Sequence, residues 1–314
     1  MKPKLILTAG AAVLLVTAAC SEAEPAQQGE EGTFRAGMPL GVTVEGQYTP
    51  ISSNVRVFGS FRFAESCTYD ESRGLIVAMN RGMPRADVEN DGYVSLINTD
   101  GSVHTTKWIG ATRDGLLLED PLGSAIRDGV LYTADIDHVR MFSIETGEPL
   151  GAHAVPGASM LNGIAVAADG TIYASNTRPE SRVFRVTPDG TASIFLDGAP
   201  LSAPNGVAID NDGNVVIVNI DDDAVLTFSP AGELVRTEHA VQAGNDGLVI
   251  LEDGTKYISS VREGGVSRIR PGQSAELVAS GIPSAASMCY DPVRHQLVIP
   301  MNDHNALAFV SLDD

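Results

Sequence analysis

The sequence predicts an all-β fold, a six-bladed β-propeller with four-stranded antiparallel blades, on three observations. A short apolar run, a tight turn and a second β-rich run recur about every forty residues along the 314-residue chain. Four-stranded units of ~40–45 residues are typical of propeller blades. No sustained 3.6-residue apolar period occurs beyond the N-terminus. Small sheets are marginally stable alone, so the units must bury their faces against one another.

A tight turn marks the middle of each unit. Asp-Gly between apolar runs favours a hairpin, because glycine accepts the positive φ of the turn. The turns are Arg73-Gly74, Asp128-Gly129, Asp169-Gly170, Asp212-Gly213, Asp253-Gly254 and, in the last unit, Arg294-His295. The second runs are Leu75 to Met79, Val130 to Thr133, Thr171 to Ala174, Val215 to Val218, Lys256 to Ser259 and Leu297 to Pro300.

The sixth unit lacks a strand, because the chain ends at Asp314 soon after its third run, Ala306 to Val310. The segment Val55 to Phe58 can supply the missing strand. We predict that this N-terminal strand closes the ring and removes an exposed sheet edge. The alternative is an unpaired edge with a loose N-terminal arm.

The N-terminus has the features of an export signal. Lys2 and Lys4 precede an apolar run, and Thr17-Ala18-Ala19 leads into Cys20. This pattern resembles a bacterial lipoprotein signal, which implies cleavage before Cys20 and lipidation of its thiol. The apolar run is roughly 15 residues, short of the ~20 that span a bilayer, so a permanent transmembrane helix is the weaker alternative. Ser21 resembles an outer-membrane address, so we expect a lipoprotein on the periplasmic face of the outer membrane.

Three segments are therefore expected: a signal peptide at 1–19, a lipidated cysteine with a flexible tether at 20–53, and a propeller at 54–314. Loss of the two lysines of the signal changes the formal net charge from −19 to −21. Such an acidic surface argues against nucleic acid and against docking to anionic headgroups. We expect a monomer that meets the membrane only through its lipid.

Two cysteines, Cys67 and Cys289, remain in the predicted propeller. They fall in the first and sixth units, which are neighbours across the ring closure, and an exported location permits a disulfide. Packed sheets lie ~10 Å apart, whereas a disulfide needs Cα atoms within ~7 Å. We therefore expect two buried free thiols, with a disulfide as the alternative.

One polar residue recurs at the same slot of several units. Asn162, Asn205 and Asp246 each precede a glycine and an apolar run, at steps of 43 and 41 residues, and Glu65 holds the slot in the first unit. Equivalent residues of a ring face one axis, so these side chains should converge at one channel mouth. Two carboxylates and two amide oxygens suit a hard cation such as Ca²⁺, with another divalent cation as the alternative. The competing explanation is turn chemistry at the start of a strand.

A second set of polar residues lies about fourteen positions beyond this slot. Because the second strand runs back toward the same face, we expect these residues to surround the metal or line the pocket floor. The alternative is ordinary turn chemistry at strand ends. The set is Asn80, Asp135, Asn176, Asn219, Ser260 and Asn302.

From about residue 54 onward the chain resembles the senescence marker protein/gluconolactonase family and the related paraoxonase-like propellers. The resemblance is carried by Ala64-Glu65-Ser66, Leu161-Asn162-Gly163-Ile164, Pro204-Asn205-Gly206-Val207 and Asn245-Asp246-Gly247-Leu248. It implies a six-bladed propeller, a divalent cation, usually Ca²⁺, at the channel mouth, and hydrolysis of a lactone or related ester.

The chain departs from this family in two places. Ser66-Cys67 stands where Gly-Pro commonly follows the glutamate. The segment 119–124 lacks the Arg and Asn-Asp of sugar-lactone members, which puts a sugar lactone in doubt.

The expected mechanism is attack of water on a carbonyl held at the metal. The candidate bases are Asp246, His138 and His304. Histidine is matched to neutral pH, although each histidine also fits an ordinary loop residue. Two other classes stay open: a non-catalytic binding module on the cell envelope, and a propeller lyase or synthase.

Overall fold

The computed structural model describes residues 42–43, 45–47, 51–59, 61–83, 89–110 and 116–313. The chain divides into Met1–Glu30 and Glu31–Asp314, and every described residue belongs to the second unit. The predicted signal peptide, Cys20 and most of the predicted tether lie outside the described residues. Within the described part, no helix has the length and apolar character needed to cross a bilayer.

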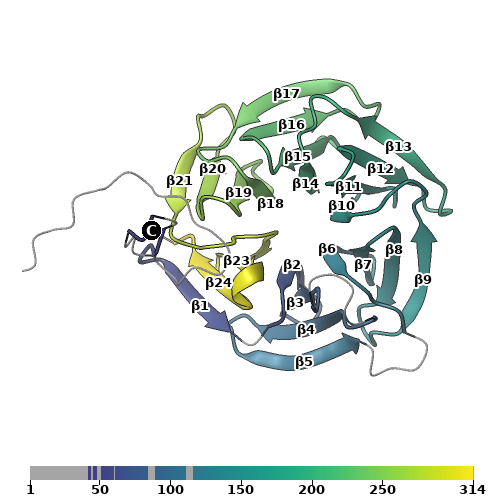
Figure 1. Cartoon of the computed structure of the whole chain (residues 1–314), viewed down its shortest axis with the longest axis horizontal. Coiled ribbons are helices and arrows are strands. Elements are labelled where there is room, and N and C mark those ends of the chain that lie inside the picture. Colours follow the sequence, from purple (N-terminus) through teal and green to yellow (C-terminus); the bar gives the residue numbers. More distant parts are fainter. Residues whose placement is uncertain are drawn as a thin grey trace, which may run out of the picture. The chain divides into compact units, whose positions relative to one another are not determined.

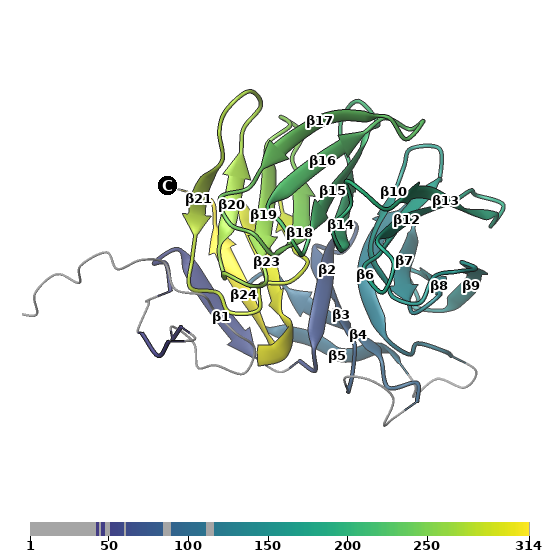
Figure 2. The same ribbon diagram turned by 45° about the horizontal axis from the view of Figure 1, so that its top comes forward.

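The described residues form six four-stranded antiparallel sheets arranged as blades around a ring (Figures 1 and 2), which confirms the predicted fold. Blade 1 contains β2 (Ala64–Asp70), β3 (Leu75–Asn80), β4 (Tyr93–Asn98) and β5 (Val103–Gly110). Blade 2 contains β6 (Pro121–Arg127), β7 (Val130–Asp135), β8 (His138–Ser143) and β9 (Pro149–Ala154). Blade 3 contains β10 (Leu161–Val166), β11 (Ile172–Asn176), β12 (Arg182–Val186) and β13 (Ala192–Asp197).

The remaining blades follow the same order from the axis outward. Blade 4 contains β14 (Pro204–Ile209), β15 (Val215–Asn219), β16 (Ala224–Phe228) and β17 (Leu234–His239). Blade 5 contains β18 (Asn245–Ile250), β19 (Lys256–Ser260), β20 (Val266–Ile269) and β21 (Glu276–Ala279). Blade 6 contains β22 (Cys289–Asp291), β23 (Gln296–Met301), β24 (Ala306–Ser311) and β1 (Val55–Gly59), and the 3₁₀ turn η1 (Asn302–His304) joins β23 to β24.

An N-terminal strand closes the ring, as predicted. β1 pairs antiparallel with β24, with Val55 opposite Val310 and Gly59 opposite Ala306. The pairing completes blade 6 from both ends of the propeller domain and covers the edge of β24. Just before β1, the Ser52 backbone N–H donates to the Ser280 carbonyl at 3.2 Å.

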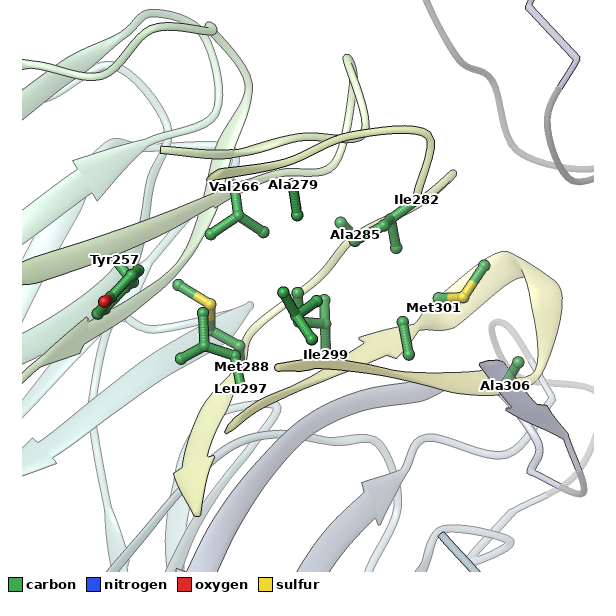
Figure 3. Packing of buried hydrophobic residues seen from close by; sticks show 12 residues of the cluster. Tyr257, Val266, Ala279, Ile282, Ala285, Met288, Leu297, Ile299, Met301 and Ala306 are labelled. Carbon is green, nitrogen blue, oxygen red and sulfur yellow. The ribbon is translucent and has the colours of Figure 1, made fainter. Parts of the chain in front are cut away.

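The hydrophobic core lies mainly between adjacent blades. Between blades 5 and 6, Tyr257 and Val266 face Leu297 and Ile299 in one buried cluster (Figure 3). Similar clusters lie between other neighbours, so each blade buries apolar surface against the next. This packing explains how small sheets combine into a stable domain.

Cys67 and Cys289 form a disulfide, so the expectation of two free thiols was wrong. Their Cα atoms lie 5.4 Å apart. The expectation used the ~10 Å spacing of facing sheets, but the innermost strands of a propeller converge on the axis and lie closer. The bond links β2 of blade 1 to β22 of blade 6.

Candidate metal centre

Glu65, Asn162, Asn205 and Asp246 occupy the same place in four blades. Each is the second residue of an innermost strand, and the strand pairing shifts register at each of them. A β-bulge inserts an extra residue and redirects the side chain. These residues therefore belong to bulged strands and not to turns. The innermost strands surround the centre of the ring (Figure 1), so the four positions share one end of the channel.

The glycines after three of these positions allow neighbouring blades to approach closely. A Cβ on Gly163 would collide with the backbone carbonyl oxygen of Asn205, and a Cβ on Gly206 would lie 2.5 Å from that of Asp246. Gly163 and Gly206 have no positive φ, so the need for glycine here is close approach and not turn geometry. The bare backbone of one blade thus packs against the residue that carries the next polar side chain.

The two carboxyl groups are buried and interact with each other. Glu65 is 5% exposed and Asp246 is 3% exposed. Burial raises the pKa of Glu65 to about 7, although a hydrogen bond from Asn302 lowers it. Burial, and then the negative charge of Glu65, raise the pKa of Asp246 well above its ordinary value. Two buried acids that repel each other lack a compensating positive charge at this place.

Three buried oxygen atoms at this site find no hydrogen-bond donor among the described residues: Asn162 Oδ1, Asn205 Oδ1 and Asp246 Oδ1. Buried polar atoms are normally paired, so a cluster of unpaired acceptors needs an explanation. A cation would bind all three and relieve the repulsion between the acids. The residues therefore fit a hard divalent cation. The described residues contain no cluster of three His, Cys, Asp or Glu side chains, because asparagines make up half of this donor set.

Side-chain amides hold the carboxylates in place. Asn302 Nδ2 donates to Glu65 Oε2 at 2.8 Å, and Asn205 Nδ2 donates to Asp246 Oδ2 at 3.2 Å. Each amide therefore fixes one carboxylate oxygen and leaves the other oxygen of that carboxylate for a further partner. Among the six residues predicted to surround the site, Asn302 is the one that contacts a predicted ligand.

The other five predicted residues bond mainly to backbone groups of nearby loops. Asn176 Oδ1 accepts from the N–H groups of Ser159 (2.9 Å) and Met160 (3.0 Å), just before β10. Asn80, Asp135 and Asn219 accept from Arg62, Asp120 and Ser202, and Ser260 donates to Ala243. Each bond ties the end of a second strand to the loop that enters the innermost strand of the same blade. These residues therefore position the site from a distance, with the strand-end chemistry that was the alternative.

Buried hydroxyl groups that the sequence did not single out join neighbouring blades. Ser175 Oγ donates to the Asn205 carbonyl at 2.6 Å, and Ser259 Oγ donates to the Ala286 carbonyl at 2.7 Å. In blade 1, Ser66 takes the place of the glycine and donates to the Leu122 carbonyl at 2.5 Å. The sequence signal for them was a small hydroxyl residue just before the end of a second strand, or just after Glu65.

The two candidate histidines lie apart from the four predicted ligands. His138 begins β8, and its Nδ1 lies 2.6 Å from Asp137 Oδ1 in a partly exposed hairpin. His304 ends η1, and its Nδ1 lies 2.9 Å from Ser284 Oγ. His304 is therefore two residues from Asn302, whereas nothing in the described contacts joins His138 to the site.

A cavity of about 670 Å³ lies beside the site, between loops of blades 1, 2 and 3. Its walls include Arg81 and Asp120, whose charges act on Glu65, and Met160, two residues before Asn162. A constriction of about 50 Å³ follows at Gly163 and its neighbours, and a cavity of about 1010 Å³ opens at the other end of the innermost strands. The larger cavity includes none of the four ligands, so the smaller one is the candidate substrate pocket.

Comparison with known proteins identifies relatives of the fold. No protein-family model matches the chain, and no curated protein matches it. Among solved structures, a gluconolactonase from Xanthomonas campestris aligns with a TM-score of 0.59 and 16% identity, over 93% of this chain and 99% of that one. A putative gluconolactonase aligns with a TM-score of 0.59 and 17% identity, over 89% and 98%.

Lyases share the fold as well. A virginiamycin B lyase from Staphylococcus aureus aligns with a TM-score of 0.57 and 13% identity, over 84% of this chain and 100% of that one. At these identities the likeness establishes the six-bladed propeller and its resemblance to gluconolactonase-like proteins. Function must be argued from the site itself.

Proposed function

We propose that the protein is a divalent-metal hydrolase, with Ca²⁺ as the expected cation, that opens a lactone or cleaves a related ester at the channel mouth. The observation that carries the proposal is the set of three buried, unpaired oxygens on Asn162, Asn205 and Asp246, next to the buried Glu65. Bound there, Ca²⁺ would supply a Lewis acid that polarises a substrate carbonyl. The resemblance to gluconolactonase-like propellers agrees with this chemistry.

The residues of the chain divide the remaining work. Asn302 and Asn205 orient Glu65 and Asp246 through one oxygen each. The cavity beside them receives the body of the substrate and limits access of water to the reacting group. Asp246 Oδ1 is our candidate to accept the proton of the attacking water, because it is the carboxylate oxygen without a donor. His304 is the second candidate, through its position on η1.

Hydrolysis should depend on the metal and on Asp246. The full-length protein is assayed against aryl esters, aliphatic lactones and sugar lactones, with chelator and with added Ca²⁺. Chelation should abolish turnover and Ca²⁺ should restore it. Asp246→Asn should lower kcat by at least about 100-fold, the lower range for loss of a general base. His138→Ala, in the exposed hairpin, is the matched control and should change kcat little.

Turnover that persists through both chelation and Asp246→Asn would place the chemistry elsewhere. Binding of Ca²⁺ without turnover of any ester or lactone would favour the binding-module or lyase alternative.

We further propose attachment to the cell envelope through Cys20. The motive is the basic, then apolar, then small-residue sequence that ends at this cysteine. A multiply acylated cysteine would hold the domain firmly at a membrane. Cys20→Ser should abolish lipid labelling and either block cleavage or release the protein from the membrane fraction. Unchanged labelling with a lipid precursor would contradict the anchor.

A further inference from the structure

The cavity at the channel mouth offers an apolar surface to its contents. Met83, Ile136, Met160 and Pro179 line it together with several charged residues. Met83 and Ile136 are each 39% exposed, which is high for large apolar side chains. Exposed apolar groups gathered in a concave site are typical of ligand pockets.

Several charged residues of the same cavity already have partners in the protein. Arg81 pairs with Asp120, with 2.8 Å between Nη2 and Oδ2. The Asp91 carboxylate accepts the Met83 N–H at 2.8 Å, and the Glu119 carboxylate accepts the Asn90 N–H at 2.8 Å. These groups are held by hydrogen bonds to their neighbours, so the apolar side chains provide much of the surface that is free to contact a ligand.

Ile136 also has an unfavourable backbone conformation. It is the first residue of a two-residue hairpin loop between β7 and β8, and its φ is 59°. Glycine or asparagine usually fills such a position, and a β-branched residue there is an outlier. Strained residues of this kind cluster at functional sites, where a constraint other than stability selects the side chain.

The strained loop is fastened to the strand that carries a predicted metal ligand. The Leu161 backbone N–H donates to the Ile136 carbonyl at 2.9 Å, and Asn162 is the next residue of β10. The apolar side chain of Ile136 is therefore held at a fixed place relative to the candidate metal centre.

We propose that Ile136, supported by Met83 and Met160, determines substrate specificity by binding an apolar alkyl or aryl substituent of the lactone or ester. The inference rests on the proposed hydrolase function and names its substrate class. A polyhydroxylated ring placed against these side chains would lose water from its hydroxyl groups without gaining hydrogen bonds, which is unfavourable. A substrate with an apolar substituent gains affinity from the same contact.

The test compares one alkyl-substituted lactone with one sugar lactone in wild-type protein and in Ile136→Gly. Glycine fits the positive φ of the loop, so the variant should melt at a temperature no lower than wild type. We expect kcat/KM for the alkyl lactone to fall about tenfold, mainly through KM, as for loss of a few methylene contacts. The lower activity on the sugar lactone should stay the same. Val293→Gly, which removes an exposed apolar side chain in the turn between β22 and β23, is the control and should change neither value.

A binding measurement separates this inference from the proposed function. An alkyl-substituted cyclopentanone, which has a carbonyl but no ester bond, is titrated by NMR into Ca²⁺-loaded protein. Weaker binding in Ile136→Gly supports the apolar site, even if no lactone or ester is turned over. Unchanged binding together with an unchanged ratio of alkyl to sugar activity overturns the inference, and leaves the hydrolase proposal intact where turnover is seen. A wild-type preference for the sugar lactone also overturns it.

Discussion

Blades 3 to 5 and the junction between blades 6 and 1 both surround the candidate metal centre, but different interactions hold them together. In blades 3 and 4, Gly163 and Gly206 let bare backbone pack against the carbonyl of the next ligand. At the junction, Ser66 stands in place of the glycine, and a disulfide ties Cys67 to Cys289. Blade 6 supplies no ligand at its equivalent position, Ala286, which precedes β22.

This difference indicates where each ligand obtains its position. Asn162, Asn205 and Asp246 depend on tight packing between neighbouring strands. Glu65 depends instead on bonds near the junction, namely the amide of Asn302 and the disulfide two residues along β2. Changes at the two places should therefore affect stability and metal binding in different ways.

The largest effect is expected from opening the junction. The disulfide closes a loop with a sequence separation of 222 residues, and long loops gain most from a crosslink. Replacing both cysteines by serine should lower the free energy of unfolding by about 4 kcal/mol, measured by urea denaturation. Reduction of the wild-type protein should produce the same loss. A loss under about 1 kcal/mol in both experiments would show that the disulfide does not hold the ring.

The second effect tests the tight packing of blades 3 and 4. Gly163→Ala places a methyl group against the Asn205 carbonyl, and overpacking of this kind costs about 2–3 kcal/mol. Urea denaturation should show that loss, and Ca²⁺ affinity should fall because Asn205 is displaced. Gly59→Ala is the control, since a Cβ there meets no atom within 4 Å. Equal behaviour of the two variants would refute the role assigned to close approach.

The smallest effect concerns pH. The pKa of Glu65 rises from an ordinary value of 4.5 to about 7 on folding, so the folded state binds the proton more tightly. Without metal, this group should stabilise the fold below pH 4.5 and lose that contribution as pH rises to about 7. Relative to Glu65→Gln, the metal-free protein should lose about 2 kcal/mol across that range. Thermal melts in chelator provide the measurement, and parallel pH profiles would contradict the raised pKa.

The repeat made much of the architecture predictable from sequence. Apolar runs around Asp-Gly turns located the blades, and the short sixth unit predicted closure by Val55 to Phe58. The disulfide was misjudged, because residue offsets do not reveal how closely strands approach at the axis. The bulges at Asn162 and its equivalents were missed too, since a bulge appears only when two strands are paired.

The candidate site was predictable only as a set of positions. One polar residue per unit identified Glu65, Asn162, Asn205 and Asp246. The predicted second ring was less informative, because an asparagine at a strand end can bond to a loop or to a ligand with equal ease. Asn176 bonds to a loop, whereas Asn302 reaches Glu65. That choice depends on loop geometry in three dimensions.

The central claim is that the four residues form one cation site, and isothermal calorimetry of Ca²⁺ binding to the metal-stripped full-length protein tests it most directly. We expect wild-type protein to bind one Ca²⁺ and to gain melting temperature as a result. Asp246→Ala should lose that binding, whereas Glu252→Gln, which removes one negative charge at the far end of the channel, should retain it. Unchanged Ca²⁺ affinity in Asp246→Ala would contradict the account.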